Sequence, residues 1–462
     1  SPMVPRLLIW KIYTMIKEPN TLTAMEAVNS IASGSLSSVD LVQSCLDQIS
    51  KTDNEINAWA YLDSENALKQ AEQCDRIRKE GKATGPLHGI PVGLKDVIDT
   101  SDMPTEFGTP IFEGHQPHKD ARIVERLRES GAVIMGKTVT TELAFMHPSK
   151  ARNPHDLDRT PGGSSSGSAA AVAANHVPIA VGTQTNGSVI RPASFCGTYG
   201  FKPSSGTIPR SGVLQTSQTL DQVGCFGRSL ADVGLLSDVL GSYDQNDLNS
   251  FSRPRPKMMD GALSEPPVTP DLAWLDLPFY DRLALETREG LDSITDILGT
   301  QVTKMTAADQ LSNLVAVQAR IHEYEICKHQ SNVFDQNWDR LSVTIKEVIS
   351  RGRQISEDEY NDALAVKTSA QDFFADFFTE FDAIIAPAAI GEAPFVKDQT
   401  TGDPIFCTLW TLAGLPSVTL PLLVGENDMP IGVQLIGEIE QDGRLLRTAS
   451  WLQQFLASEA SK

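Results

Sequence analysis

The sequence predicts an α/β protein with a large hydrophobic core. Two observations support this fold class. Segments with the apolar spacing of a helix alternate along the chain with short apolar runs that are typical of buried strands. Of the 462 residues, 40% are hydrophobic and 21% are charged, which is the balance of a globular protein that is long enough to bury a sizeable core.

The first part of the chain predicts helices before it predicts strands. Residues 23–53 have helical spacing with a Gly-Ser interruption and predict two helices, and residues 64–81 predict a third helix that ends at Gly81. Residues 85–100 predict a turn followed by a buried strand. Residues 120–138 predict a helix, a glycine stop and a second short strand, which establishes the alternation.

The second half of the chain predicts a return to the same sheet. Residues 252–271 are rich in proline and charge, and they predict either a domain boundary or a surface loop within one domain. Residues 280–380 predict helices of mixed charge, and residues 442–456 predict a closing helix. Three late strands are predicted, at residues 381–389, 414–422 and 430–437.

Composition also limits the organisation and the partners of the chain. An N-terminal arm over residues 1–20 is expected to precede one domain over residues 21–462. The net charge of -20 provides no basic surface for nucleic acid or an anionic membrane. No apolar run reaches the ~18 residues of a membrane span. The six cysteines include no Cys-x-x-Cys pair and indicate reduced thiols of a cytoplasmic protein.

A block rich in glycine, serine and alanine, residues 160–188, is the most unusual part of the sequence. A serine hydroxyl is a poor nucleophile until a base takes its proton, and this block is not built around a histidine. Gly163–Gly167 fits the G-x-S-x-G pattern that would make Ser165 the nucleophile of an α/β-hydrolase. The context disagrees, because a polar loop precedes the pattern and its histidine would have to be His322 or His329, in a charged helical segment.

Other local patterns point to no further site. Asn186–Ser188 matches a glycosylation sequon, but its apolar and glycine-rich flanks favour a coincidental match. The block lacks the G-x-x-x-x-G-K-[ST] sequence of a phosphate-binding loop. The histidine pairs His115/His118 and His322/His329 lack the carboxylate or thiolate neighbours of a metal site, so no metal is expected.

The glycines and serines have a different use, and the base comes from elsewhere. They allow close backbone approach and leave N–H groups free, so a loop that runs into a helix predicted at residues 168–175 can hold an oxyanion. Lys95 follows the apolar residues of a predicted strand, where it is either exposed at a strand edge or buried. Burial would lower the pKa of the amine, and a neutral amine can act as a base.

Together these segments resemble the amidase signature family. The resemblance is closest over the catalytic core, residues 85–225, in GIPVGLKDVID, NPHDLDRTPGGSSSGSAAAVAA and GTQTNGSVIRPASFCGTYGFKPSSGTIPRSGV. It is weaker in IIAPAAIGEAP, GLPSVTLPL and PIGVQLIG, and residues 226–380 form a variable, substrate-side region. The resemblance implies the amidase signature fold, a large twisted mixed β-sheet flanked by helices on both faces.

The same resemblance implies a Ser–cis-Ser–Lys triad. Matched position by position, Ser188 is the nucleophile, Ser164 is the bridging serine and Lys95 is the terminal base. The bridging serine follows a cis peptide bond, here Gly163–Ser164. Neutral Lys95 draws a proton from Ser164, which draws one from Ser188, and Ser188 then attacks the carbonyl and forms an acyl-enzyme. No cofactor is expected.

The family also implies an oxyanion hole. The backbone N–H groups of Thr185, Asn186, Gly187 and Ser188 are expected to form it, and Ser165 is expected to hydrogen-bond beside the triad.

This chain departs from the commoner family pattern at three positions. Many members have Asp where this chain has Gln184 and Gly where it has Asn186, and they carry Arg two residues after the nucleophile rather than three, where Arg191 stands. The Asp and Arg changes are expected to be linked, because glutamine forms no ion pair with a guanidinium. Asn186 can still supply a main-chain N–H. Arg191 is expected to support the site in a role that the family pattern does not define.

The expected function is hydrolysis of a small linear amide, a carbon–nitrogen bond other than a peptide bond. Esters and carbamates share the tetrahedral chemistry, so the same site is expected to cleave them. The alternative is the glutamine-hydrolysing, ammonia-releasing subunit of a tRNA-dependent amidotransferase, which requires partner proteins. A homodimer is expected at the level of the family only.

The substrate pocket is the least defined part of the prediction. Phe145, Met146, Phe406 and Trp410 are candidates for an apolar pocket around the acyl or amine part of the substrate. The same four side chains equally fit a hydrophobic core.

Overall fold

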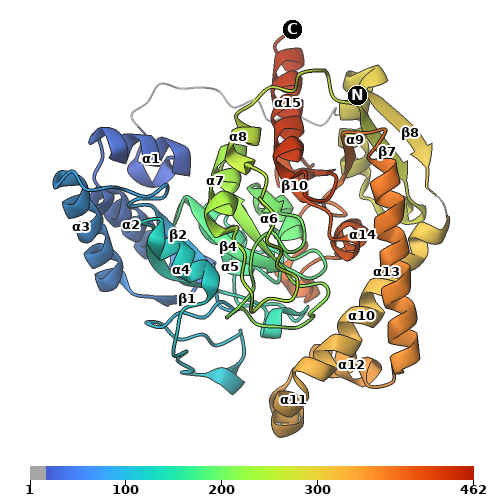
Figure 1. Ribbon diagram of the computed structural model, residues 1–462, viewed down its shortest axis with the longest axis horizontal. Helices are drawn as coiled ribbons and strands as arrows, with labels where there is room; N and C mark the ends of the chain where they lie inside the picture. Colours follow the sequence, from blue (N-terminus) through green and yellow to red (C-terminus); the bar gives the residue numbers. More distant parts are fainter. Residues whose placement is uncertain (1–16, 308) are drawn as a thin grey trace.

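One mixed β-sheet runs through the molecule. The computed structural model describes residues 17–307 and 309–462, so most of the predicted N-terminal arm, residues 1–16, lies outside the described part (Figure 1). The 11 strands form one sheet in the order β1-β3-β2-β4-β6-β5-β10-β11-β9-β7-β8. The strands are β1 (Trp59–Leu62), β2 (Pro91–Lys95), β3 (Val133–Thr138), β4 (Ile179–Gln184), β5 (Tyr199–Lys202), β6 (Gln222–Gly227), β7 (Leu272–Asp276), β8 (Val302–Thr306), β9 (Ala383–Pro387), β10 (Ser417–Val424) and β11 (Pro430–Ile436).

The sheet combines parallel and antiparallel pairs, as the sequence predicts. β2 lies parallel to β3 and β4, and β7 lies parallel to β8 and β9, while the central strands from β4 to β9 pair antiparallel. The α-helices are α1 (Ala24–Ser33), α2 (Ser38–Ile56), α3 (Ser64–Lys79), α4 (Arg122–Glu129), α5 (Ser166–Ala173), α6 (Ile190–Cys196), α7 (Leu230–Leu240), α8 (Met258–Ala262), α9 (Leu285–Leu298), α10 (Leu314–His329), α11 (Ser331–Asn337), α12 (Val343–Gly352), α13 (Glu357–Phe377), α14 (Ile405–Ala413) and α15 (Asp442–Ala460).

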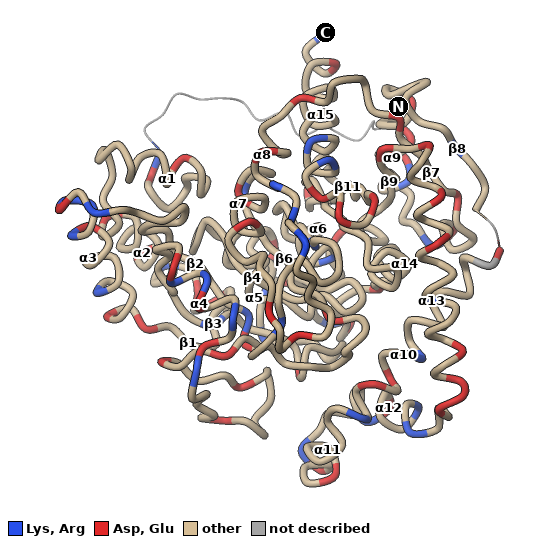
Figure 2. Tube along the Cα trace, viewed as in Figure 1, with Lys and Arg blue, Asp and Glu red and all other residues tan. Residues whose placement is uncertain are grey.

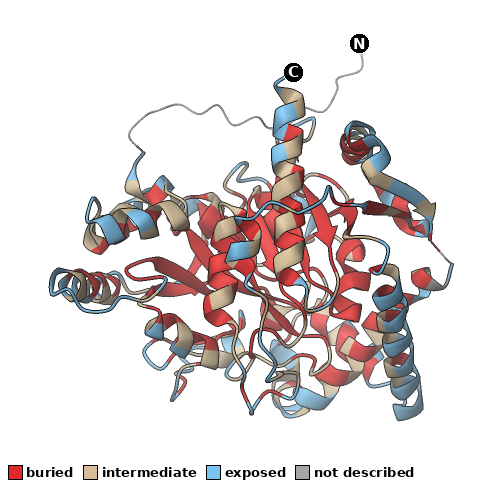
Figure 3. Cartoon of the chain, turned by 45° about the horizontal axis from the view of Figure 1, so that its top comes forward, coloured by how far each residue is buried: buried red, intermediate tan, exposed pale blue. Residues whose placement is uncertain are grey.

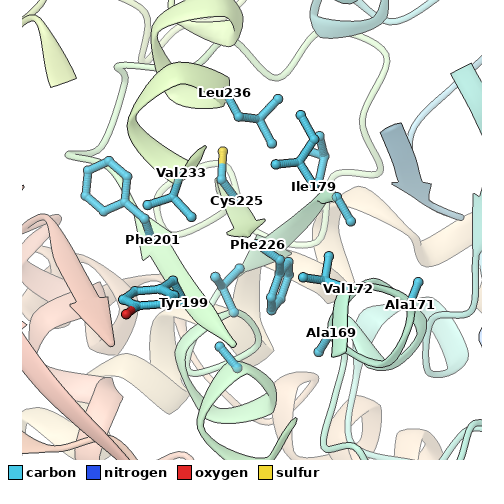
Figure 4. Close-up of a cluster of buried hydrophobic side chains, with 14 of the residues drawn as sticks. Ala169, Ala171, Val172, Ile179, Tyr199, Phe201, Cys225, Phe226, Val233 and Leu236 are labelled. Carbon is cyan, nitrogen blue, oxygen red and sulfur yellow. The ribbon is translucent and has the colours of Figure 1, made fainter. Parts of the chain in front are cut away.

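Helices cover both faces of the sheet. Successive side chains of a strand point to opposite faces. On β6, Cys225 points toward Val233 of α7, whereas Phe226 points toward Ala169 and Val172 of α5 (Figure 4). The strands are buried throughout the centre of the molecule, and exposed residues lie on the outer helices and loops (Figure 3). Several acidic residues follow one another along α13, where the backbone trace is coloured red (Figure 2).

The small residues of the 160–188 block are required by close packing. Helix α5 contains only Ser, Gly, Ala and Val, and seven of its eight residues are buried. At Gly167, a Cβ atom would lie 2.2 Å from the carbonyl oxygen of Ala58 and 2.3 Å from the amide nitrogen of Val139. The backbone N–H of Gly167 instead donates to the Val139 carbonyl at 2.8 Å. The block is therefore a rigid, buried part of the core.

The predicted helix limits have local causes. A capping box between Thr23 and Glu26 begins α1, and Gly34 ends it in the left-handed conformation with φ of 79°. Gly81, also left-handed with φ of 68°, follows α3. Both stops agree with the prediction of separate helices over residues 23–53 and 64–81.

Two later segments refine the sequence prediction. Residues 252–271 contain the short helix α8, which packs against α7 and α15, and the sheet continues on both sides of this segment. The helical region 280–380 also contains an edge strand, β8, which the prediction missed. Its sequence, VTKMT, is polar and largely exposed, so it lacks the apolar run that identified the other strands. No helix in residues 17–307 and 309–462 is long and apolar enough to cross a membrane.

The two-faced packing of β6 can be tested by truncation. Phe226→Ala should lower the free energy of unfolding by about 3–5 kcal/mol, because it leaves a cavity between the sheet and α5. Leu248→Ala is the matched control, because Leu248 is 84% exposed while Phe226 is fully buried. Urea unfolding midpoints measure both variants. Equal midpoints for the two variants would contradict the packing described here.

Candidate active site

Lys95 lies at the end of β2, in the interior of the sheet. Its side chain is fully buried, so the predicted alternative of an exposed strand edge does not occur. The amine Nζ donates to Ser164 Oγ at 2.6 Å and to Thr183 Oγ1 at 2.7 Å. Both acceptors are hydroxyl groups, and neither carries a charge that would stabilise an ammonium ion.

Burial lowers the pKa of Lys95 well below its ordinary value. Loss of water is the largest cause; the carboxylate of Asp221 opposes the shift, and the guanidinium of Arg191 adds to it. A larger fraction of the amine is therefore neutral near pH 7 than for an exposed lysine. A neutral amine that touches a serine hydroxyl can accept the proton of that hydroxyl.

Ser164 and Ser165 have different contacts. The peptide bond between Gly163 and Ser164 is cis. Ser165 precedes α5, and its hydroxyl donates to the Thr183 carbonyl at 3.1 Å and accepts from the Thr183 N–H at 3.2 Å. Ser165 therefore holds Thr183, which in turn holds Lys95, and within the described residues Ser165 has no direct hydrogen bond to Lys95, Ser164 or Ser188.

Ser188 belongs to the loop between β4 and α6. The Gln184 side chain orders this loop, because its Oε1 accepts from the N–H groups of Val189 and Ile190 at 2.8 and 3.0 Å. Ser188 is 9% exposed, compared with 2% for Ser164. Lys95 and Ser164 are thus joined by a hydrogen bond, while the described residues show none between Ser164 and Ser188.

The loop of Thr185–Ser188 presents its N–H groups without intramolecular acceptors. Within residues 17–307 and 309–462, the backbone N–H groups of these four residues have no hydrogen-bond acceptor. Its carbonyls, in contrast, are held from outside the loop. The Thr185 carbonyl accepts from Gln318 Nε2 at 3.1 Å, and the Asn186 carbonyl accepts from Thr411 Oγ1 at 2.5 Å. Fixed carbonyls and unused N–H groups are the arrangement that an oxyanion requires.

Side chains of the same loop add three further anchors. Asn186 Oδ1 accepts from Thr408 Oγ1 at 2.7 Å, and Asn186 Nδ2 donates to Gln318 Oε1 at 3.4 Å. The hydroxyl of Thr185 donates to Asp221 at 2.6 Å. Gln318 comes from α10, and Thr408 comes from α14. The loop is therefore braced by elements that lie far from it in the sequence.

Among the described residues, Arg191 forms no ion pair and contacts neutral groups. Its Nε donates to the Thr401 carbonyl at 2.9 Å, and its NH2 donates to the Gly163 carbonyl at 2.8 Å. Burial lowers the pKa of Arg191 to about 10, so it remains protonated near pH 7. Gln184 caps α6 and does not contact the guanidinium, so the two departures from the family pattern serve separate contacts.

A cavity of about 190 Å³ adjoins the Lys95 site. Thr183 and Thr185 line it together with residues of the 210–223 segment. Arg210 is the one arginine among the described residues that line the cavity. It is paired with Asp247, with 2.8 Å between Arg210 NH2 and Asp247 Oδ1. That described lining therefore contains no unpaired cation.

The four predicted pocket residues lie outside the lining of that cavity. Phe406 and Trp410 are 3% and 1% exposed and belong to a buried hydrophobic cluster, and the indole N–H of Trp410 donates to the Phe406 carbonyl. Phe145 stacks on His322 with ring centroids 4.6 Å apart, and Met146 is half-buried. These contacts favour the packing alternative for Phe406 and Trp410.

Several contacting residues were not predicted from the sequence. Thr183 and Asp221 lie within residues 85–225, where the resemblance to the family is closest, but the sequence does not predict their contacts. Gln318 and Thr411 lie in or beyond the variable region and carry no motif. In the described part of the chain, no group of three His, Cys, Asp or Glu side chains could hold a metal ion.

Comparison with known proteins identifies the family. The Amidase family model matches residues 40–446. The chain belongs to the amidase signature family. A curated amidase signature relative, a glutamyl-tRNA(Gln) amidotransferase subunit of Natranaerobius thermophilus, is 32% identical over 94% of this chain and 96% of its own length.

Solved amidase signature structures share the fold over nearly the whole chain. One is described as a vestigial protein complex that reveals the evolutionary origins of an s-triazine catabolic enzyme. It has a TM-score of 0.87 and 28% identity, and the match covers 94% of this chain and 98% of that one. Peptide amidase from Stenotrophomonas maltophilia has a TM-score of 0.82 and 26% identity, over 94% of this chain and 96% of its own.

The brace from α10 can be tested at Gln318. Gln318→Leu adds no charge but removes the donor to the Thr185 carbonyl. We therefore expect kcat on an amide or nitrophenyl ester to fall about tenfold, less than for loss of an oxyanion donor itself. Gln371→Leu is the matched control, because Gln371 also donates to a backbone carbonyl, that of Ala413, at 3.2 Å. Equal rates for the two variants would show that the loop does not depend on Gln318.

Proposed function

We propose that this chain hydrolyses a small linear amide through an acyl-enzyme on Ser188. The observation that carries the proposal is the 2.6 Å hydrogen bond between the buried amine of Lys95 and Ser164, with the pKa of Lys95 lowered. A neutral amine against a serine hydroxyl is the base that the serine-rich block lacks. The resemblance of the block to the family supplies Ser188 as the nucleophile.

In the proposed reaction, Lys95 accepts a proton from Ser164 as Ser164 accepts one from Ser188. The Ser188 oxygen bonds to the amide carbonyl carbon, and the carbonyl oxygen becomes an oxyanion. The proton returns through Ser164 to the leaving nitrogen, the C–N bond breaks, and the amine departs. Water, deprotonated by the same relay, then attacks the ester and releases the acid and Ser188.

The N–H groups of Thr185–Ser188 are proposed to hold the oxyanion. The carbonyls of Thr185 and Asn186 in this loop are fixed by Gln318 and Thr411. The N–H donors of the loop therefore need little reorganisation when charge develops. Removing one donor of this kind typically costs about 10²–10³ in rate.

The adjoining cavity supports a small substrate. Its volume of about 190 Å³ is somewhat larger than the roughly 150 Å³ cavity that admits benzene. Since Arg210 is paired with Asp247, the substrate group that enters this cavity is expected to carry no negative charge. Esters and carbamates of similar size are proposed as additional substrates.

A second candidate function is glutamine hydrolysis as one component of an amidotransferase. The observation that favours it is the 32% identity, over 94% of this chain, to a relative whose name makes it part of such an enzyme. Both candidates begin with the same cleavage of an amide at Ser188. They differ in substrate and in the need for partner proteins. A homodimer and a cytoplasmic location remain predictions from the sequence.

A substrate panel separates the two candidates. Purified protein is offered a small aliphatic amide, an anilide, a nitrophenyl ester, an aryl carbamate and glutamine. Turnover of the simple amides without a partner supports the amidase. Turnover of glutamine but of no other compound in the panel supports the amidotransferase component. Activity that appears only when a co-purified partner is added supports it as well.

Removal of the nucleophile or the base should abolish turnover. Ser188→Ala and Lys95→Ala are each expected to lower kcat/KM on the best substrate of the panel by at least about 10³-fold, since the variants lack the attacking oxygen or its base. Circular dichroism checks that both variants fold. A folded variant with near-wild-type turnover would overturn the assigned role.

The pH profile reports the state of Lys95. The amine accepts a proton only when neutral, so kcat/KM should rise with pH through the lowered pKa of Lys95 and then level off. Rates are measured from about pH 5 to pH 10 on a substrate that does not ionise. A flat profile over this range, or one that falls as pH rises, would exclude a lysine base.

A further inference from the structure

Arg191 carries a buried positive charge that nothing near it neutralises. The side chain is 1% exposed, and its acceptors are two backbone carbonyls and the hydroxyl of Thr401. Within residues 17–307 and 309–462, no carboxylate lies within salt-bridge distance of it, and its NH1 nitrogen has no hydrogen-bond partner. A buried charge is normally paired, so this arrangement needs an explanation.

The titratable groups around Arg191 leave its charge in place. Asp403, just before α14, is paired with Arg282 at the surface and only partly opposes the effect of burial on Arg191. Burial raises the pKa of the Cys407 thiol to about 12, so this thiol is neutral near pH 7. The pKa of Arg191 itself stays at about 10.

The guanidinium lies between the two loops that carry the serines. NH2 donates to the carbonyl of Gly163, the residue joined to Ser164 by the cis bond. NH1 lies against Gly187, where a Cβ atom would come within 2.8 Å of it. Arg191 is the second residue of α6 and lies three residues after Ser188. One planar group thus binds the carbonyl of Gly163, before Ser164, and lies beside Gly187, before Ser188.

We propose that Arg191 is a positioning residue with two linked effects. Its guanidinium fixes the Gly163 carbonyl, and so Ser164, in front of Lys95, and its unneutralised charge disfavours protonation of the Lys95 amine. This inference rests on the proposed function, because it assigns Arg191 a task only if Lys95 is the base.

The other charged groups near Lys95 act in the opposite direction or not at all. The Asp221 carboxylate favours protonated Lys95, but it accepts hydrogen bonds from Thr185, Thr216 and Ser217. His322 of α10 contacts Thr216, and burial lowers its pKa, so it is neutral near pH 7. Arg191 is therefore the cation that offsets Asp221.

Charge and geometry can be separated by substitution. Arg191→Met and Arg191→Gln remove the charge, whereas Arg191→Lys keeps the charge but has no fork that reaches both the Gly163 and Thr401 carbonyls. Arg228→Met is the matched control. Arg228 is also a buried arginine that donates to backbone carbonyls, those of residues 20, 22, 172 and 177, and these contacts involve neither serine loop.

The readout is the titration of Lys95. Lysine is labelled with ¹³C at Cε, and the Lys95 signal is identified by its loss in Lys95→Met, so the measurement does not require activity. In Arg191→Met and Arg191→Gln, Lys95 should titrate roughly half a unit to one unit higher than in the wild type. The acid limb of kcat/KM should move by the same amount wherever activity is measurable.

Each outcome decides the proposal. Arg191→Lys should leave the titration of Lys95 within about 0.3 unit of the wild type while kcat falls at least about tenfold. Arg228→Met should change neither, whatever it does to stability. Unchanged titration of Lys95 in both Arg191→Met and Arg191→Gln would overturn the proposal. So would a change in these variants that is confined to KM for substrates that carry a carboxylate. Failure of Ser188→Ala to abolish turnover would instead overturn the proposed function.

Discussion

The geometry of the candidate active site depends on the burial of the Lys95 amine without a carboxylate partner. Two other lysines are equally buried, but they differ in their contacts. Lys137 lies 3.5 Å from the Asp96 carboxylate, and Lys202 donates to the Pro203 carbonyl and to Gln222. Lys95 donates to two hydroxyl groups and is the one among these three that contacts a serine. Because a buried ammonium is costly without a counter-ion, this environment favours the neutral amine, and a neutral amine is a base.

The burial of Lys95 requires small side chains in the glycine- and serine-rich block, residues 160–188. Helix α5 must lie directly against the sheet so that Ser164 and Ser165 reach Lys95 and Thr183, and its Gly and Ala residues permit this approach. The Thr185–Ser188 loop is held by α10 and α14, both more than 100 residues later in the chain. The long variable region therefore contributes to the candidate site, since Gln318 of α10 fixes the Thr185 carbonyl of this loop.

The sequence predicts the parts of this structure that depend on local pattern. Apolar spacing and glycine stops located α1 to α5, α15 and the strands β2, β3, β9, β10 and β11, but not β1 or β4 to β8. The block around Ser164 together with Lys95 identified the family. The sequence did not predict contacts made by tertiary packing. Gln318 is an ordinary helix residue until α10 packs beside the loop, and Trp410 fits a pocket or a core until its neighbours are known. The role of Arg191 is similar, because its acceptors come from residues 163 and 401.

The measurement that most directly tests this account is the location of the acyl group during turnover. Purified protein is mixed with a nitrophenyl ester, quenched in acid within milliseconds, digested and analysed by peptide mass spectrometry. The account predicts one acyl group per chain, on the peptide that contains Ser188, and no acyl group on that peptide in Lys95→Ala. An acyl group on Ser165 or on another residue, or rapid turnover with no acylated peptide, would contradict it.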